Sequence, residues 1–309
     1  MTAPKLHPAE PDTGAPLVRA LLAAQFPQWA GLPVTPLDSA GTSNAVFRLG
    51  ADRVVRLPRT AGSAADVAKE QRWLPYLAPR LPVAVPLPLG QGVPGEGYPW
   101  PWSVHTWLDG EAATVVEPEA LAEPEALAVE LARFIGALHL IDPADGPPSY
   151  RSEPLAARDA PVRAAIAGLA VTEPGTVDAE VAEAVWAAGL HAAAHPGPAV
   201  WIHADLQPGN VLTSGGRLSA VIDFGCLGLG DPAVDHLAAW YLLPAAAHPA
   251  FRAALPPDHT DDACWARGRA WALSTALGEL HYYRDTRPAM ADTARQVIRR
   301  VLGSFQTRR

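Results

Sequence analysis

A short run of polar residues set in apolar sequence, between positions 201 and 225, constrains the fold of this chain more than any other feature. His203, Asp205 and Asn210 lie in a loop between apolar flanks. Asp223 ends a buried-looking strand, Ala220–Ile222, directly before Phe-Gly. A lone buried carboxylate costs on the order of several kcal/mol. We therefore expect a partner for Asp223, and a divalent cation is a natural one.

The residue types in this segment suit phosphoryl transfer. Asp205 can orient an attacking hydroxyl and accept its proton, while Asn210 and Asp223 offer hard oxygen ligands for Mg²⁺ that bridges nucleotide phosphates. The spacing H-x-D-x-x-x-x-N, with D-F-G thirteen residues later, follows the order of the protein-kinase catalytic set. Chance co-occurrence of all these residues at that spacing is improbable.

Short alternating apolar runs give way to Ala- and Glu-rich helical sequence after Gly110, and this change predicts two lobes. Two domains are also typical of a chain of 309 residues. We predict an α+β fold, with a small lobe over 1–108 built on antiparallel strands and a mainly helical lobe over 109–309. In the first lobe the patterns predict strands at 34–38, 45–49, 54–57, 85–89 and 102–108, a helix over 15–29 and a second helix N-capped by Ser63. In the second lobe they predict helices at 119–140, 178–190, 233–247, 262–284 and 289–305 and β runs at 210–213 and 218–223; the rest of 141–200 is hard to interpret.

Composition excludes several classes of protein. Hydrophobic residues at 49% and charged residues at 18% are typical of a globular chain. Cys226 and Cys264 have no metal or redox spacing, no apolar window approaches the roughly 18 residues of a membrane helix, and the N-terminus lacks a signal-peptide plan. We therefore expect a cytoplasmic protein without a membrane segment. A monomer or a weak dimer is our default expectation, because the oligomeric state leaves no trace in the sequence.

Charge is distributed unevenly. The net charge of −8 argues against a nucleic-acid partner. The first lobe holds nine Lys or Arg against seven Asp or Glu, whereas the second holds fifteen against twenty-five. The acidic second lobe favours a cationic small-molecule partner.

The chain resembles the aminoglycoside phosphotransferase family, small-molecule kinases with a bilobal protein-kinase-like fold. The resemblance is carried by His203–Leu212, Val221–Gly225 and Gly230–Asp235, and it extends to Arg53–Arg59, Glu70 and Tyr98–Glu111. It implies transfer of the γ-phosphoryl of ATP or GTP to a hydroxyl of a cationic antibiotic such as an aminoglycoside. A macrolide and a small metabolite alcohol are the alternative acceptors. The absence of Ala-Pro-Glu separates the chain from protein kinases.

The resemblance also implies roles for individual residues. In the second lobe Asp205 is the catalytic aspartate, Asn210 holds magnesium together with Asp223, and Asp235 braces the catalytic loop. His203 either touches substrate as a catalytic residue or braces this loop by hydrogen bonds.

In the first lobe the resemblance implies a nucleotide site. Glu70 pairs with a basic residue on the third strand, and Ser43 and Asn44 cover the phosphates. His105–Leu108, which includes Trp107, is the hinge whose backbone reads the purine.

One position departs from the family pattern. The third-strand lysine is replaced by Arg56, and Lys5 and Lys69 are the only lysines in the sequence. Arginine is permanently charged and can fork onto both Glu70 and a phosphate, but its reach differs. The alternative is therefore a catalytically impaired nucleotide-binding module.

Other patterns have plainer interpretations. Ser43 and Asn44 can form a simple turn, and a hydrolase nucleophile at Ser43 is disfavoured because a strand follows it. The three tryptophans Trp100, Trp102 and Trp107 fit a strand-face core better than a stacking platform. Two acidic groups are candidate contacts for a cationic acceptor: Asp109, Glu111, Glu117, Glu119, Glu123, Glu125 and Glu130, and Asp261, Asp262, Glu279 and Asp285. A solvated helix face explains the first group better, and a helix N-cap explains Asp261 or Asp262 equally well.

Overall fold

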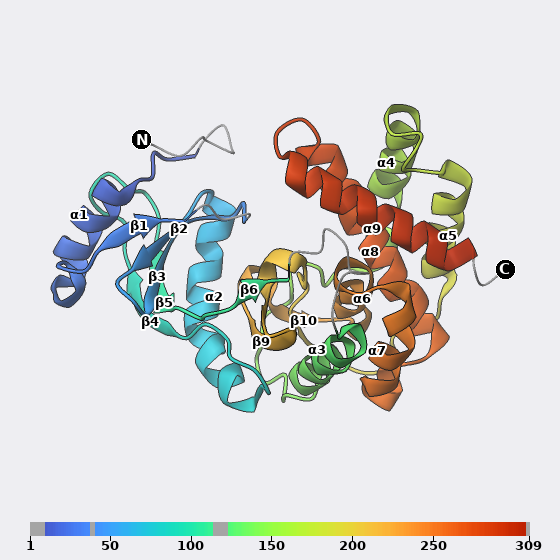
Figure 1. Cartoon of the computed structure of the whole chain (residues 1–309), viewed down its shortest axis with the longest axis horizontal. Coiled ribbons are helices and arrows are strands. Elements are labelled where there is room, and N and C mark those ends of the chain that lie inside the picture. The colour runs from blue at the N-terminus through green and yellow to red at the C-terminus, as the bar shows by residue number, and fades with distance from the viewer. Residues whose placement is uncertain (1–9, 38–40, 114–122, 307–309) are drawn as a thin grey trace. The chain divides into compact units, whose positions relative to one another are not determined.

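The computed structural model describes residues 10–37, 41–113 and 123–306, and the chain divides into two compact units (Figure 1). The first unit is Met1–Gly110 together with Ala220–Gly225, and the second is Glu111–Ser219 with Cys226–Arg309. The division after Gly110 lies two residues from the predicted boundary. The sequence did not predict that 220–225 would join the first unit.

The first unit is built on an antiparallel five-stranded sheet in the order β1-β2-β3-β5-β4. Gly50, with φ of +61°, occupies the left-handed conformation that the tight β2–β3 turn requires. The register places Arg56 opposite Val46 on one side and Ser103 on the other. The strands are β1 (Val34–Pro36), β2 (Asn44–Leu49), β3 (Arg53–Pro58), β4 (Pro88–Gly92) and β5 (Trp102–Thr106).

One face of this sheet packs on α1 (Ala15–Gln25) to form the apolar core of the first unit. Alternate strand residues such as Val55 and Val104 point into it because side chains alternate between the faces of a strand. Trp102 is fully buried there and Trp100 packs against it half-buried, as predicted. Trp107 does not belong to this core, because the Arg48 guanidinium stacks over its ring at 3.8 Å.

The other face of the sheet carries α2 (Ala61–Leu77). Its N-cap is Thr60, whose hydroxyl accepts the Ser63 N–H at 3.2 Å, so the prediction of Ser63 as the cap was wrong. The predicted strand at 85–89 was also misplaced, because β4 begins at Pro88. Ala84 instead accepts the Val221 N–H at 3.1 Å, and this contact ties 220–225 to the first unit.

The second unit is mainly helical, as predicted. Its helices are α3 (Pro124–His139), α4 (Asp159–Thr172), α5 (Ala179–His191), α6 (Ala238–Leu242), α7 (His248–Ala254), α8 (Asp262–Tyr283) and α9 (Pro288–Gln306). Helix α4 was missed, and the predicted helix over 233–247 is broken into a 3₁₀ segment, α6 and a further 3₁₀ turn after Pro244. No described helix is long and apolar enough to span a membrane.

Short strands frame the loops of this unit. They are β6 (Glu111–Ala112), β7 (Val200–Ile202), β8 (Val211–Ser214), β9 (Arg217–Val221) and β10 (Gly228–Gly230), of which β9 ends in two residues of the first unit. Strand β10 pairs with β7, directly before the loop that carries Asp205. Gly228 is required because a Cβ there would lie 2.4 Å from the Ser149 backbone nitrogen.

Helix α8 is buried on most of its circumference, because α5, α9 and the 3₁₀ segment Pro232–Leu237 pack around it. Asp261 caps its N-terminus and accepts the Cys264 N–H. The plainer interpretation of Asp261 as an N-cap is therefore confirmed. Burial of α8 fixes the side chains on its later turns, which include Glu279.

Candidate active site

A buried carboxylate holds the loop of the second unit that carries Asp205. Asp235, fully buried, accepts the N–H groups of His203 at 3.0 Å and Ala204 at 2.7 Å. The His139 imidazole lies 3.1 Å from the same carboxylate. Ala204 has φ of +66°, a strained conformation for a residue with a Cβ. The Asp235 contacts hold the backbone in this conformation, directly before Asp205.

Asp205 is surrounded by donors. The Asn210 amide donates to its carbonyl at 2.8 Å and to Oδ2 at 3.0 Å. Gln207 Nε2 and Arg151 Nη1 donate to Oδ1 at 3.1 and 3.0 Å. The side chain remains 23% exposed, so it is fixed in orientation and still accessible to an acceptor.

His203 is fully buried. Its Nδ1 accepts the Asp205 N–H at 3.2 Å. This geometry favours the loop-bracing alternative over direct contact with substrate.

A second carboxylate of this unit lies beside Asp205. Gln207 Nε2 donates to Glu279 Oε1 at 2.6 Å as well as to Asp205, and the Tyr241 hydroxyl donates to Glu279 Oε2 at 2.8 Å. Burial, reinforced by the Asp205 charge, raises the pKa of Glu279 to about 7. Glu279 is thus the member of the predicted second acidic group that is joined to Asp205.

The other acidic candidates have structural partners or lie in solvent. Asp285 is 83% exposed beside Arg284, and Asp262 is 89% exposed. Glu130 accepts the Arg217 guanidinium at 2.7 Å and the Leu218 N–H at 2.9 Å, so it closes the β8–β9 hairpin. Asp109 accepts the Trp107 indole N–H at 2.7 Å, and Glu117 and Glu119 lie outside the described residues.

The first unit contains an arginine shared by two carboxylates. Arg56 Nη1 donates to both oxygens of Glu70 at 2.7 Å, and Nη2 donates to Asp223 Oδ1 at 2.8 Å. Burial by itself would lower the pKa of Arg56, but the charges of Glu70 and Asp223 outweigh it and hold this pKa above its usual value. The predicted contact of Arg56 with Glu70 is present, and the second arm of the guanidinium contacts Asp223, which the sequence did not predict.

Lys69 adds a contact that the sequence did not suggest. Its ammonium donates to Asp66 at 2.8 Å and to the Gly225 carbonyl of the Asp-Phe-Gly segment. Asp223 itself has φ of +61°, a conformation that costs on the order of 1–3 kcal/mol. Helix α2 therefore holds this strained segment at two points, through Glu70 with Arg56 and through Lys69.

The predicted hinge residues are placed differently from the expectation. His105 is a fully buried residue inside β5, with neighbours on β3 and β4. Its ring nitrogens have no hydrogen-bond partner in the described part of the chain. Burial, with the Arg56 charge, lowers the pKa of His105 to about 3. Strand β5 ends at Thr106, two residues before the predicted end, and the Trp107 N–H still donates to the Asp52 carbonyl at 2.9 Å.

Ser43 and Asn44 adjoin the start of β2. The exposed Ser43 offers its carbonyl to the Arg59 N–H at 2.9 Å, and Asn44 pairs with Pro58. A strand follows Ser43 directly, which excludes the strand–turn–helix geometry of a hydrolase nucleophile. Their role at phosphates remains a prediction.

Asn210 in the second unit and Asp223 in the first, the two residues predicted to hold magnesium, each have an oxygen that could serve as a ligand. Asn210 uses its amide nitrogen on Asp205, and its carbonyl oxygen takes no hydrogen bond from the described residues. Arg56 uses only Oδ1 of Asp223. Each residue thus keeps one oxygen of the kind that Mg²⁺ prefers, whereas the described residues contain no cluster of three or more His, Cys, Asp or Glu arranged for a metal.

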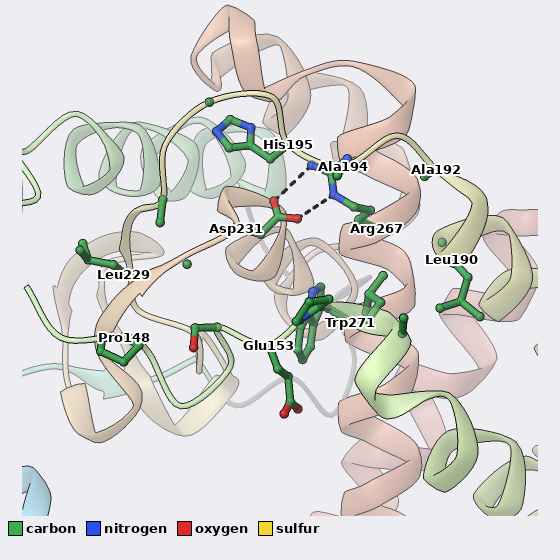
Figure 2. A pocket seen from close by; sticks show the side chains of 18 of the residues that line it. Pro148, Glu153, Leu190, Ala192, Ala194, His195, Leu229, Asp231, Arg267 and Trp271 are labelled. Atoms are coloured by element: carbon green, nitrogen blue, oxygen red, sulfur yellow. Dashed lines mark hydrogen bonds and ion pairs between the residues drawn. The ribbon is translucent and has the colours of Figure 1, made fainter.

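A pocket of about 650 Å³ lies within the second unit (Figure 2). Its walls are largely apolar and include Leu155, Leu190, Leu229 and Trp271. The Arg267 guanidinium lies against Asp231 on one wall, with Nε at 2.7 Å from Oδ2. This ion pair compensates the two charges that face the pocket.

Comparison with known proteins gives one family and one fold. The sequence matches the phosphotransferase enzyme family over residues 34–297. Among solved structures, the GDP complex of wild-type aminoglycoside 2'-phosphotransferase-IIIa is 18% identical with a TM-score of 0.69, over 94% of this chain and 99% of that one. The apoenzyme of macrolide 2'-phosphotransferase MphH from Brachybacterium faecium is 25% identical with a TM-score of 0.57, over 92% and 98%. None of the curated proteins matches the sequence.

Proposed function

Because the chain belongs to the phosphotransferase enzyme family, we propose that it transfers the γ-phosphoryl of ATP or GTP to a hydroxyl of a cationic small molecule such as an aminoglycoside. The observation that carries the proposal is Asp205, an accessible carboxylate whose orientation is fixed by Asn210, Gln207 and Arg151.

Asp205 performs the acceptor side of the reaction. Its exposed carboxylate accepts the proton of the attacking hydroxyl and aligns that oxygen with the phosphorus. The transition state of phosphoryl transfer is loose, so alignment contributes more than basicity. His203 acts as a positioning residue because it holds the Asp205 backbone from a buried site.

Arg56, Asn210 and Asp223 perform the donor side. Arg56 supplies a permanent charge for the phosphates, and Glu70 fixes its direction. Asn210 and Asp223 are the residues that would hold Mg²⁺, which when bound neutralises charge on the phosphate oxygens.

The acceptor class follows from charge. Glu279, joined to Asp205 through Gln207, is a carboxyl group with a raised pKa that a nearby ammonium group would bring back toward its ordinary value. The acidic second lobe attracts cations over a longer range. Kanamycin and gentamicin appear in complexes of structures with this fold, and they are suitable first probes.

The experiment is a transfer assay with ³²P-labelled ATP and GTP against kanamycin, gentamicin, streptomycin and erythromycin. We expect labelled product with at least one aminoglycoside and a loss of at least about 10³-fold in kcat for Asp205→Asn. Arg163→Met is a matched control, because Arg163 is 43% exposed on α4. Transfer by Asp205→Asn at the wild-type rate would contradict the assignment.

A macrolide is the second candidate acceptor. It is favoured by the largely apolar pocket of about 650 Å³ and by the 25% identity to a macrolide 2'-phosphotransferase. Leu190→Glu introduces a charge into that pocket. If the acceptor is a macrolide seated there, this variant raises KM for erythromycin about tenfold or more, whereas KM for kanamycin is unaffected.

The impaired-module alternative predicts nucleotide binding without transfer. The bidentate Arg56–Glu70 pair supports an active enzyme, because the charge required at the phosphates is anchored. Binding of MgATP by calorimetry, together with no turnover of any acceptor or of water, would favour the alternative.

A further inference from the structure

Arg151 lies outside every motif of the sequence and contacts the centre of the candidate site. It belongs to the loop between α3 and α4, and its guanidinium Nη1 donates to Asp205 Oδ1 at 3.0 Å and also to the Ala204 carbonyl. Only 12% of the Arg151 side chain is exposed. We propose that Arg151 is a positioning residue for phosphoryl transfer, which holds the Asp205 carboxylate toward the acceptor and balances its charge. This inference rests on the proposed function.

The loop that carries Arg151 is fixed at its base. The Ser149 N–H donates to the Leu229 carbonyl at 2.9 Å, and the Ser149 hydroxyl donates to the Cys226 carbonyl at 2.7 Å. The Arg151 N–H donates back to Ser149 Oγ at 3.1 Å. Arg151 therefore starts from an ordered backbone, so only the rotamer freedom of its side chain is lost when it engages Asp205.

The charges around Asp205 explain why a cation is needed there. Glu279 lies one side chain away through Gln207, and the phosphoryl group that approaches Asp205 is itself an anion. An isolated carboxylate would repel both. Arginine stays charged at any physiological pH, so the Arg151–Asp205 pair presents little net charge to the incoming phosphoryl group.

The geometry also constrains orientation. Arg151 and Gln207 occupy Oδ1 of Asp205, while Asn210 occupies Oδ2. Three donors from two loops thus fix the carboxylate plane. Loss of Arg151 frees the side chain to rotate, and misalignment of a reacting group lowers the rate of the chemical step more than it lowers binding.

The experiment compares Arg151→Met, Arg151→Lys and the exposed control Arg163→Met. Two rates are measured: transfer to kanamycin, and release of inorganic phosphate from MgATP with water as acceptor. We expect Arg151→Met to lower kcat 10- to 100-fold with KM values within threefold. Arg151→Lys recovers part of the loss because it keeps the charge, and Arg163→Met matches the wild type.

A double-mutant cycle separates this role from simple support of the fold. If Arg151 acts through Asp205, Arg151→Met costs less than threefold in an Asp205→Asn background. Equal losses in both backgrounds would overturn the proposal, and so would wild-type kcat for a folded Arg151→Met. If Arg151→Met shows no melting transition, the Arg151→Lys variant tests the proposal instead. Wild-type kcat in Arg151→Lys would overturn the role of the guanidinium fork. If the wild-type protein hydrolyses MgATP but transfers no phosphoryl group to kanamycin, only the proposed acceptor is contradicted.

Discussion

Two arginine–aspartate pairs serve the two units, and their surroundings differ. Arg56 projects from the regular strand β3 and is shared between Asp223 and Glu70, whose side chain is 3% exposed. Arg151 projects from a loop onto Asp205, whose side chain is 23% exposed. The two aspartates are similarly accessible, Asp223 at 30% exposed and Asp205 at 23%, so the difference is the buried Glu70, which depends on Arg56 and has no counterpart beside Arg151. Removal of Arg56 should therefore reduce stability and activity together, and removal of Arg151 should reduce mainly activity.

The largest expected effect is on stability. Arg56→Met leaves Glu70 buried without its cation, which costs about 3–5 kcal/mol. Arg151→Met should cost no more than about 1 kcal/mol, because Asp205 keeps two donors and access to water. Urea unfolding of both variants measures the difference, and equal losses would remove the distinction between the pairs.

The next effect is a pH dependence that arises from buried neutral histidines. In the second unit, burial lowers the pKa of His259 to about 4 and that of His236 to about 3. Unfolded histidine takes up its proton near pH 6.5, so stability is constant above that pH and falls by about 1.4 kcal/mol per pH unit for each histidine as pH drops from 6.5 toward 4. Urea unfolding at several pH values checks this slope.

A substitution at His259 tests the origin of that slope. His259→Gln keeps a polar group beside His139 Nδ1, 3.1 Å away, but it cannot titrate. We expect its unfolding free energy to change less steeply with pH by about 1.4 kcal/mol per unit. His105→Phe is the counterpart in the first unit, where the pKa of about 3 gives the same sign. A wild-type slope in His259→Gln would assign the dependence to other groups.

A smaller effect distinguishes the forked geometry of the Arg56 guanidinium from its positive charge. Arg56→Lys keeps a cation but cannot reach Glu70 and Asp223 with separate nitrogens. We expect about a tenfold lower kcat, measured with MgATP at saturation. A rise in kcat would instead indicate that the native arginine impairs the enzyme.

The smallest expected effect concerns Lys69. Lys69→Met removes the contacts to Asp66 and to the Gly225 carbonyl. Arg56 still holds Asp223 in this variant. The binding free energy of MgATP should therefore weaken by about 1 kcal/mol, which calorimetry would record as a roughly fivefold lower affinity. If the same calorimetry shows that Arg56→Met weakens MgATP binding no more than Lys69→Met does, Lys69 is an equal anchor of this segment.

Local pattern predicted the parts of the fold that local physics controls. Strands β2, β3 and β5 follow from alternation, and α5 and α9 follow from helical spacing within one or two residues. The errors at Ser63 and at 85–89 concern the positions at which a helix and a strand begin, and a single capping residue or a single proline sets such a boundary. Helix α4 was missed because Ala- and Pro-rich sequence gives little periodic signal, and 220–225 was assigned to the wrong unit because its partner Ala84 is distant in the chain.

The sequence by itself singled out the residues to which we assign the chemistry, because Asp205, Asn210, Asp223 and Arg56 are recognisable from type and spacing. Only the tertiary structure decided what surrounds them. Arg151 reaches Asp205 across 54 positions of sequence, and Glu279 reaches Gln207 across 72. No repeating pattern records contacts at such separations, because they arise from the packing of loops and of α8 rather than from the preferences of neighbouring residues.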